Sequence, residues 1–299
     1  MDPPLIQETD GVPMDGEYST LFRGIKGFRF AISAWVICLV AGALTPPGSS
    51  YAASEPESRH MPTITIVYDN NPYREGLETA WGFSCLVRGM ERTILFDTGG
   101  DGGVLLANMR KLNISPSEID AVIISHIHGD HAGGLFPLLG EVRRIIVFIP
   151  ASFPDPFKRE VGKQGAKAVS VRGPVKICSD VYSTGELGTT PLEQALVVRT
   201  ARGLVIVTGC AHPGIVNIVR TARERFGKEV LLVLGGFHLA GRGKDEIEAV
   251  IAGLKKLGVR HVAPCHCTGD IARMLFMRAY GEGFIDAGVG RVIATEDLR

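Results

Sequence analysis

The sequence has no excess of charge of either sign, no internal repeat and no low-complexity segment. Lysine and arginine together number 32, as do aspartate and glutamate, so the formal net charge is zero. No basic block with interleaved aromatic residues occurs, so the chain lacks the features that attract a nucleic-acid backbone, and we expect no nucleic-acid partner. Because 45% of the residues are hydrophobic and 21% are charged, the composition is that of a globular protein.

Cysteine is too sparse for a disulfide framework. Six cysteines occur in 299 residues, and one of them, Cys38, lies in an N-terminal apolar run. The remaining five are an odd number, so at least one is free or intermolecular if the domain is exported. A domain of this size can bury its own core, so it does not depend on disulfides for its stability.

The N-terminal region, residues 1–53, combines a polar segment with an apolar one. Three basic residues precede the apolar run at 30–44, and small residues follow it. This order is typical of a secretory signal peptide, because the run is shorter than the ~20 residues that a spanning helix needs. An uncleaved membrane anchor with its basic flank inside is the alternative. Either interpretation predicts that residues 54–299 form a catalytic domain that is periplasmic, extracellular or anchored facing outward.

Strands and helices alternate from about residue 61, which predicts an α/β fold. Apolar or β-branched runs mark the strands, and apolar residues at helical spacing mark helices, for example at 215–226 and 247–257. Residues 151–200 are less regular. Their short apolar pieces predict a meander of antiparallel strands at 168–171, 181–183 and 196–198.

Histidine is concentrated at the ends of predicted strands. Six of the eight histidines lie in such turns: His126, His128, His131, His212, His238 and His266. Strand ends in a layered α/β fold gather at one edge of a sheet, where ligand sites form. Imidazole and carboxylate are the ligands that zinc prefers, and iron and manganese accept them too. The histidines therefore predict a metal site at this edge.

The densest group is the loop 126–131, which follows an apolar strand at 121–124. His126 and His128 alternate on one face of an extended loop, so both can reach one metal ion. Asp130 and His131 are displaced along the chain and can serve a second ion. A binuclear pair, with ions ~3.5–4 Å apart, lowers the pKa of a shared water molecule toward neutrality.

Further candidates follow other strands. We expect His212 to bind metal rather than only to cap the following helix, because its turn is flexible and its neighbour Ala211 is small. Asp97 either braces its own turn or orients a metal-bound histidine from behind. For Cys210 and His238, the roles of ligand, support of a ligand and substrate contact stay open. His266 lies between two cysteines, but this spacing lacks the partner pair of a structural zinc site.

Two motifs carry a resemblance to a known family. The sequence His-Ile-His-Gly-Asp-His at 126–131 resembles the HxHxDH signature of the metallo-β-lactamase superfamily, and Asp97 in Leu-Phe-Asp-Thr-Gly matches the first motif of that family. Motifs at 69–71, 208–214, 235–239 and 265–269 resemble one branch, which is named for 7,8-dihydropterin-6-methyl-4-(β-D-ribofuranosyl)aminobenzene 5′-phosphate synthase. The resemblance covers nearly all of 63–299 and implies a four-layer αββα sandwich with the site at one sheet edge.

The resemblance also implies a ligand set. His126 and His128 would hold one ion, and Asp130 and His131 a second ion that His266 joins. The third histidine that the superfamily supplies to the first ion is absent from 132–211, and His212 is the available substitute. Cys210 stands where a bridging aspartate is common, so either Cys210 binds metal or the bridge is missing. We expect two divalent ions, zinc before iron or manganese, with a single ion as the alternative.

These residues predict a metal-dependent hydrolase of ester, phosphoester or lactone-type small molecules, with Asp130 as a catalytic residue as well as a ligand. A transferase like the synthase of the named branch is one alternative, although export fits poorly with a cytoplasmic pathway. A metal-binding or sensor module without turnover is another. Hydrolysis of β-lactams suits an exported protein, but the flanking motifs resemble the synthase branch instead.

Overall fold

The computed structural model of this protein describes residues 61–227 and 229–298. The predicted signal peptide or anchor, and the domain boundary predicted after residue 53, lie outside these residues. Within them, no helix is both long enough and apolar enough to cross a membrane. The five cysteines of this part of the chain are all free and buried.

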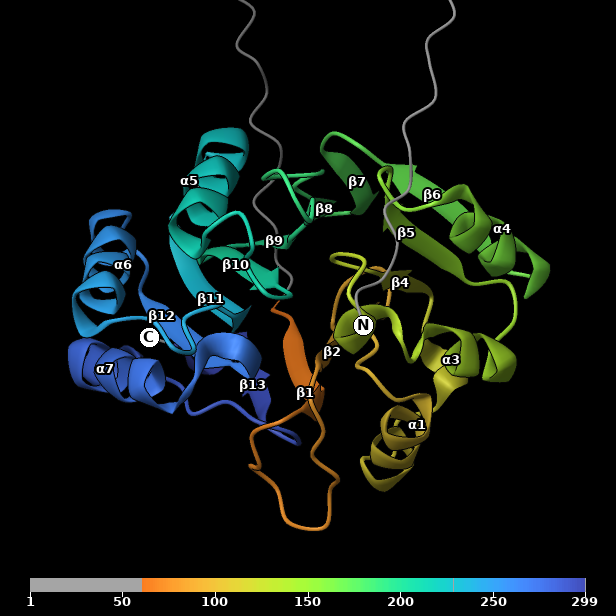
Figure 1. The fold of residues 1–299 in the computed structure, drawn as a ribbon, viewed down its shortest axis with the longest axis horizontal. Helices are drawn as coiled ribbons and strands as arrows, with labels where there is room; N and C mark the ends of the chain where they lie inside the picture. Colours follow the sequence, from red (N-terminus) through yellow and green to blue (C-terminus); the bar gives the residue numbers. More distant parts are fainter. Residues whose placement is uncertain (1–60, 228, 299) are drawn as a thin grey trace, which may run out of the picture. The chain divides into compact units, whose positions relative to one another are not determined.

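Two mixed β-sheets form the middle of the domain (Figure 1). The first sheet has the strand order β13-β1-β2-β3-β4-β5-β6, and the second has the order β12-β11-β10-β9-β8-β7. The strands of the first sheet are β1 (Thr63–Asp69), β2 (Phe83–Arg88), β3 (Ile94–Phe96), β4 (Ala121–Ile123), β5 (Ile146–Pro150), β6 (Lys167–Val171) and β13 (Val292–Ala294). Those of the second are β7 (Val175–Cys178), β8 (Val181–Ser183), β9 (Leu196–Thr200), β10 (Gly203–Thr208), β11 (Val230–Gly236) and β12 (His261–Cys265).

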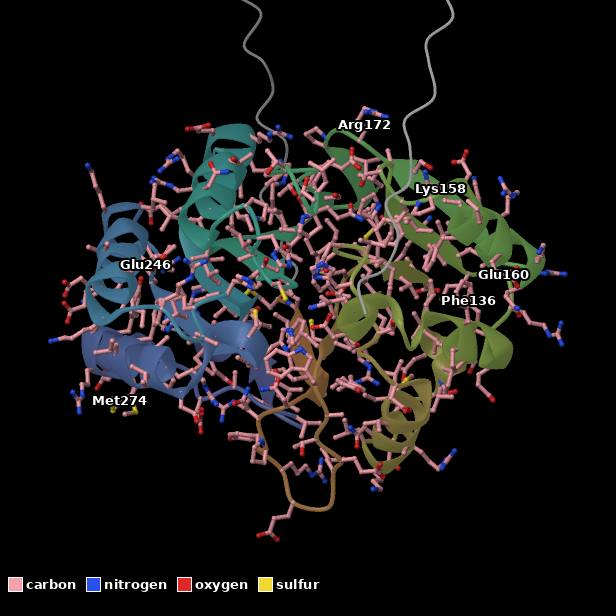
Figure 2. All side chains as sticks on the ribbon, viewed as in Figure 1. Phe136, Lys158, Glu160, Arg172, Glu246 and Met274 are labelled. Carbon is pink, nitrogen blue, oxygen red and sulfur yellow. The ribbon has the colours of Figure 1, made fainter. Side chains whose placement is uncertain are left out.

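The helices cover the outer faces of the two sheets (Figure 1). The first sheet carries α1 (Gly102–Lys111), α3 (Leu135–Glu141) and α4 (Asp155–Lys163), and the second carries α5 (Ile215–Phe226), α6 (Lys244–Lys256) and α7 (Asp270–Tyr280). One short helix, α2 (Gly129–Ala132), lies in the ligand-rich loop. Charged side chains such as Glu160 and Glu246 lie on the outer faces of these helices (Figure 2). This arrangement confirms the predicted four-layer αββα sandwich.

The alternation of side chains along β4 shows how the sequence builds these layers. Ala121 and Ile123 point into the core between the sheets, whereas Val122, and Ile124 directly after the strand, point into the core under the helices. Successive residues of a strand face opposite sides, so a strand with both faces covered must be apolar throughout. The same rule explains β10, in which every residue is buried.

The prediction for residues 151–200 was partly wrong. The segment predicted at 168–171 is β6, and it pairs parallel with β5 in the first sheet. Parallel pairing needs a crossover, and the unpredicted helix α4 provides it. Helix α4 begins after Pro154, is nine residues long and buries only Val161, so few apolar residues mark it in the sequence. The antiparallel meander does exist, but it consists of β7, β8 and β9 in the second sheet.

Five strand ends meet at one edge of the sandwich. Strands β3 and β4 are parallel neighbours in the first sheet, and β10, β11 and β12 are parallel neighbours in the second. Parallel neighbours bring their carboxyl ends to the same edge of a sheet. The turns that follow these strands hold Asp97, the 126–131 loop, Cys210 with His212, His238, and His266.

Candidate metal centre

The first two histidines lie at the end of β4. His126 is buried and His128 is exposed, and His126 Nε2 lies 3.2 Å from His128 Nδ1. After His128 the chain turns into α2, which carries Asp130 and His131, and the ring of His131 lies 4.3 Å from that of His126 between centroids. His126, His128 and Asp130 also form a group whose ligand atoms lie within 4.8 Å of one another, so the four candidate ligands lie close together and their division into two pairs stays a prediction.

One compact group of ligand atoms comes from Asp130, His131, Cys210 and His266. Cys210 Sγ lies 3.1 Å from His131 Nε2 and 3.4 Å from His266 Nε2. Asp130 Oδ2 lies 3.6 Å from His131 Nε2 and 3.3 Å from His266 Nε2. Tetrahedral zinc with bonds of about 2.0–2.3 Å keeps its ligand atoms about 3.3–3.7 Å apart. These separations therefore fit a divalent ion.

A second group consists of His126, Cys210 and His212. The ring of His212 lies 4.7 Å from that of His126 and 4.9 Å from that of His128, between centroids. His212 Nε2 is buried and has no hydrogen-bond partner among the described residues. A buried, unpartnered imidazole nitrogen is costly unless a ligand satisfies it, so this atom also fits a metal ion.

Cys210 belongs to both groups of ligand atoms. The structure thus brings together all six predicted metal ligands and places Cys210 between them. The hydrogen bond with Cys267 and burial raise the pKa of the Cys210 thiol, so a bound cation would have to displace its proton. The resulting thiolate would favour zinc and other borderline or soft ions over magnesium or calcium. His238 lies at the rim: its ring is 4.5 Å from that of His212, and it forms a further group of candidate ligands with Cys210 and Cys267.

Asp97 lies behind the ligands. Its Oδ2 accepts a hydrogen bond from His131 Nδ1 at 2.7 Å, which leaves His131 Nε2 to face the metal position. The backbone N–H and hydroxyl of Ser125 donate to the same carboxylate at 2.6 and 2.7 Å. Ser125 Oγ also lies 2.9 Å from His126 Nδ1, so it can accept a hydrogen bond from that ring. Asp97 therefore supports His131 directly and His126 through Ser125.

The surroundings keep two of the histidines neutral. Burial lowers the pKa of His126 far below its ordinary value, and the imidazoles of His131 and His212 lower it further. Burial, with His238 and His128 nearby, lowers the pKa of His212 to about 4. A neutral ring has a nitrogen lone pair available for a metal ion at pH 7. The site therefore favours metal binding over protonation at these two residues.

Asp130 and His131 have pKa values shifted in the direction that favours their charged forms. Burial raises the pKa of the Asp130 carboxyl, but the hydrogen bond from His266 and the charge of His131 outweigh it and hold the value below the ordinary one. Burial acts against protonation of His131, yet the adjacent Asp97 carboxylate raises the pKa of that imidazole. The carboxylates of Asp97 and Asp130, which stabilise a protonated His131, would also stabilise a metal ion bound to it.

Several supporting residues were not predicted. Asn70 Oδ1 accepts a hydrogen bond from His266 Nδ1 at 2.9 Å, so Asn70 orients His266 as Asp97 orients His131. Glu193 and Gln194 are buried between the two ligand-bearing regions. Asn70 lies in a motif that resembles the synthase branch, but nothing in the local pattern around Glu193 distinguishes it from a surface residue. Cys267 lies beside Cys210. The hydrogen bond between the two thiols lowers the pKa of Cys267.

One side of the centre is open to solvent. His128 and His238 are exposed there, and Ile127 between the first two histidines is 42% exposed. Trp81 is 57% exposed, with its ring centroid 4.9 Å from that of His266. Exposed apolar side chains beside buried ligands offer a surface for a substrate that reaches the ions.

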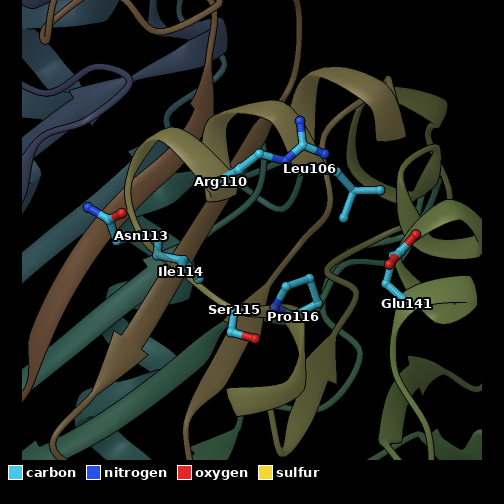
Figure 3. Close-up of a pocket in the computed structure, with 7 residues that line it drawn as sticks. All are labelled: Leu106, Arg110, Asn113, Ile114, Ser115, Pro116 and Glu141. Carbon is cyan, nitrogen blue, oxygen red and sulfur yellow. The ribbon is translucent and has the colours of Figure 1, made fainter.

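A surface pocket of about 410 Å³ lies elsewhere. Figure 3 shows its lining, with Leu106 and Arg110 on α1 and Glu141 on α3. It contains none of the candidate ligands. The chemistry that the strand ends predict therefore belongs to the metal centre and not to this pocket.

Comparisons with known proteins identify the family of this chain. Residues 82–225 match the sequence model of the metallo-β-lactamase superfamily. A 7,8-dihydropterin-6-methyl-4-(β-D-ribofuranosyl)-aminobenzene-5′-phosphate synthase of Methanocaldococcus jannaschii is 32% identical over 278 residues, which cover 77% of this chain and 95% of the relative. The chain belongs to the metallo-β-lactamase superfamily. The predicted family is thus confirmed.

Solved structures of the superfamily share its fold. Tm1679, a metal-dependent hydrolase of the β-lactamase superfamily, is 31% identical with a TM-score of 0.67, and the match covers 78% of this chain and 98% of that one. The metallo-β-lactamase fold protein YhfI from Bacillus subtilis is 16% identical with a TM-score of 0.58, over 79% of this chain and 99% of YhfI. The second likeness concerns the fold alone.

Proposed function

We propose that this chain is a metal-dependent hydrolase that acts on an ester, phosphoester or lactone-type small molecule. The observation that carries this proposal is the pair of ligand groups that share Cys210 at the solvent-facing edge of the two sheets. Two divalent ions held there would supply a water-derived nucleophile at neutral pH and stabilise negative charge on the reacting group.

The chain's own residues divide the remaining work. Asp130 is a partly exposed carboxylate whose pKa lies below its ordinary value, so it stays ionised and can orient water by accepting its proton in a hydrogen bond. The hydrogen bond with Cys267 raises the pKa of the exposed His238 imidazole, so a larger fraction is protonated near neutral pH. A protonated His238 can donate to a leaving group.

The first test is metal content combined with turnover. The purified chain is expected to hold two equivalents of a transition metal by elemental analysis, and to hydrolyse at least one member of a panel of phosphoesters, lactones, thioesters and β-lactams. His126→Ala is expected to lose both the metal at its group and the activity. A chain with no stoichiometric metal, whose activity His126→Ala leaves unchanged, would contradict the proposal. Full metal loading with no turnover would favour a metal-binding or sensor module.

A transferase reaction is the second candidate, favoured by the 32% identity to the synthase over 95% of that relative. Its test is the formation of the product that the relative's name describes, measured by mass spectrometry with the metal-loaded chain. If that product forms and no member of the panel is hydrolysed, the transferase replaces the hydrolase.

We also propose that the catalytic domain works outside the cytoplasm, because a basic flank, an apolar run and small residues follow one another in residues 23–53. Expression in a bacterial host followed by cell fractionation and N-terminal sequencing tests this. Export with cleavage or membrane attachment is expected. An uncleaved protein in the cytosol would overturn the proposal and strengthen the transferase candidate.

A further inference from the structure

Two adjacent buried residues, Glu193 and Gln194, touch both halves of the metal centre. We propose that they form a brace, defined as this dipeptide, that sets the spacing between the ligands of the first sheet and those of the second. Both are positioning residues, since they act through the loops that carry the ligands. The inference rests on the proposed function only in that the centre holds metal.

Glu193 holds the turn that carries Cys210 and His212. It is 1% exposed, and its carboxylate accepts hydrogen bonds from four successive backbone N–H groups, those of residues 209–212, at 2.8–3.1 Å. The hydroxyl of Thr208 donates to the same carboxylate at 2.9 Å. Successive N–H groups that converge on one point form an anion-binding nest, and the side chain here fills that nest.

The backbone of this turn needs such support. Ala211 has φ of 60°, a left-handed conformation that residues other than glycine seldom adopt. A Cβ on Gly209 would lie 2.2 Å from Ser125 Oγ, so the turn also approaches the neighbouring loop closely. An ionised carboxylate only accepts hydrogen bonds, which suits a set of donors alone. An amide in its place would turn an NH₂ group toward at least one of these donors.

Gln194 holds the other half. Its Nε2 donates to the carbonyl oxygens of Ile124 at 2.8 Å and of Phe148 at 3.2 Å. Its backbone N–H donates to the carbonyl oxygen of Ser125 at 2.9 Å. Ser125 directly precedes His126 and contacts Asp97, so Gln194 fixes the point from which the 126–131 loop starts. Its Oε1 accepts from Ser183 Oγ at 2.5 Å, which anchors it to β8.

The two side chains therefore tie together loops from different sheets. The 126–131 loop follows β4 of the first sheet, and the turn with Cys210 and His212 follows β10 of the second. Cys210 must lie close to both ligand groups, so a small shift between the sheets would separate it from one of them. Because Glu193 and Gln194 are adjacent in the chain, the turn held by Glu193 cannot move far unless the loop held by Gln194 moves with it.

The test uses the full chain loaded with cobalt(II), because a cobalt–thiolate bond from Cys210 gives a charge-transfer absorption band. Wild type is expected to bind two ions and to show the band. Glu193→Gln is expected to lose the band and to weaken the binding of one ion by about 10–100-fold. Glu193→Asp, which keeps the charge but shortens the reach, should retain part of the band. Two tightly bound ions with an unchanged band in Glu193→Gln would overturn the brace.

The matched control is Asn108→Asp, an amide-to-carboxylate change at a side chain that is also fully buried and hydrogen-bonded. Asn108 bonds the backbone of Val67 and Glu78 and touches no ligand loop. It is expected to lower stability and leave both ions and the band in place. Loss of the band in this variant as well would show that any buried substitution disturbs the site, and would contradict the brace.

Amide hydrogen exchange of the metal-free chain separates this inference from the proposed function. Glu193→Gln is expected to speed the exchange of the amides of residues 209–212, and Gln194→Leu that of Ser125. Unchanged exchange at 209–212 in Glu193→Gln would contradict the brace whatever the activity. A wild-type chain that binds two ions but hydrolyses no substrate would contradict the hydrolase and leave the brace intact.

Discussion

Cys210 lies at the middle of the candidate ligands. Its Sγ lies 3.1 and 3.4 Å from the Nε2 atoms of His131 and His266, and it also belongs to the group with His126 and His212. Cys210 stands where the resemblance places a bridging carboxylate, and its sulfur would contact both ions if two were bound. Because thiolates prefer zinc and softer ions, metal binding by Cys210 would favour those ions over magnesium or calcium.

Asp97 allows a sharp test at one residue. Asp97→Asn keeps the size of the side chain but removes the charge that accepts from His131 Nδ1 and from Ser125. Metal affinity is expected to fall by about 10–100-fold, the usual effect of removing a partner behind a metal-bound histidine. Competition with a chromogenic chelator measures this. Asp120→Asn is the control, because Asp120 only accepts from the backbone of Thr93 at an exposed turn. Equal affinities for both variants would show that Asp97 merely braces its turn.

His212 predicts how the stability of the metal-free chain depends on pH. Its pKa is about 4 when folded and about 6.5 when unfolded, so between these values the unfolded chain binds more protons. Stability is therefore lost as pH falls from about 6.5 toward about 4. We expect a loss of roughly 1–2 kcal/mol from His212, because it is only half-buried and solvent screens its charge.

Urea unfolding of the chelator-treated chain at about pH 7 and about pH 5 measures this loss. His131 acts in the opposite sense, because Asp97 raises its pKa, so the comparison needs a single-residue variant. His212→Asn, which cannot titrate, should show a smaller drop between the two pH values. An identical drop in both chains would contradict the assignment to His212.

At the scale of elements, some strands and ligands could be predicted from local sequence and others could not. The strand β10 and the ligands that follow it were predictable, because a run of buried apolar residues and the turn after it are local signals. The parallel pairing of β6 with β5 was not predictable, because it depends on the crossover helix α4, which buries a single residue. Glu193 was missed for a related reason: its role comes from backbone N–H groups 16 to 19 residues further along the chain.

The turn after β10 offers a prediction about backbone space. In Gly209→Ala the new Cβ would meet Ser125 Oγ at 2.2 Å and Asp97 Oδ2 at 3.0 Å. Stability is expected to fall by about 1–3 kcal/mol, as for other overpacked buried positions, and metal affinity should fall with it. Gly140→Ala is the control: its Cβ meets nothing within 4 Å, and it lies in α3. Alanine there should stabilise the helix by up to about 1 kcal/mol. Denaturant unfolding checks both signs, and a neutral Gly209→Ala would mean that the turn can move away from Ser125.

At the scale of the whole domain, the metal centre lies where the two sheets meet at their edge. The first sheet supplies the 126–131 ligands, and the second supplies Cys210, His212 and His266. Bound ions would therefore link two layers that otherwise adhere through their apolar core. Anything that binds only the folded state stabilises it, by about 2.7 kcal/mol per site at a ligand concentration of one hundred times Kd.

Removal of metal by a chelator is accordingly expected to lower the midpoint of thermal unfolding, and added zinc should restore it. With a shift of about 2–4 °C for each kcal/mol in a domain of this size, the change should reach at least several degrees. His126→Ala is the control, because it lacks one ligand and should respond less to the chelator. Bound ions would join both sheets, so on removal of metal hydrogen exchange should rise in the turns after β4 and after β10 together. Exchange that rises on one sheet alone would show that the ions bind to that sheet and do not connect the two.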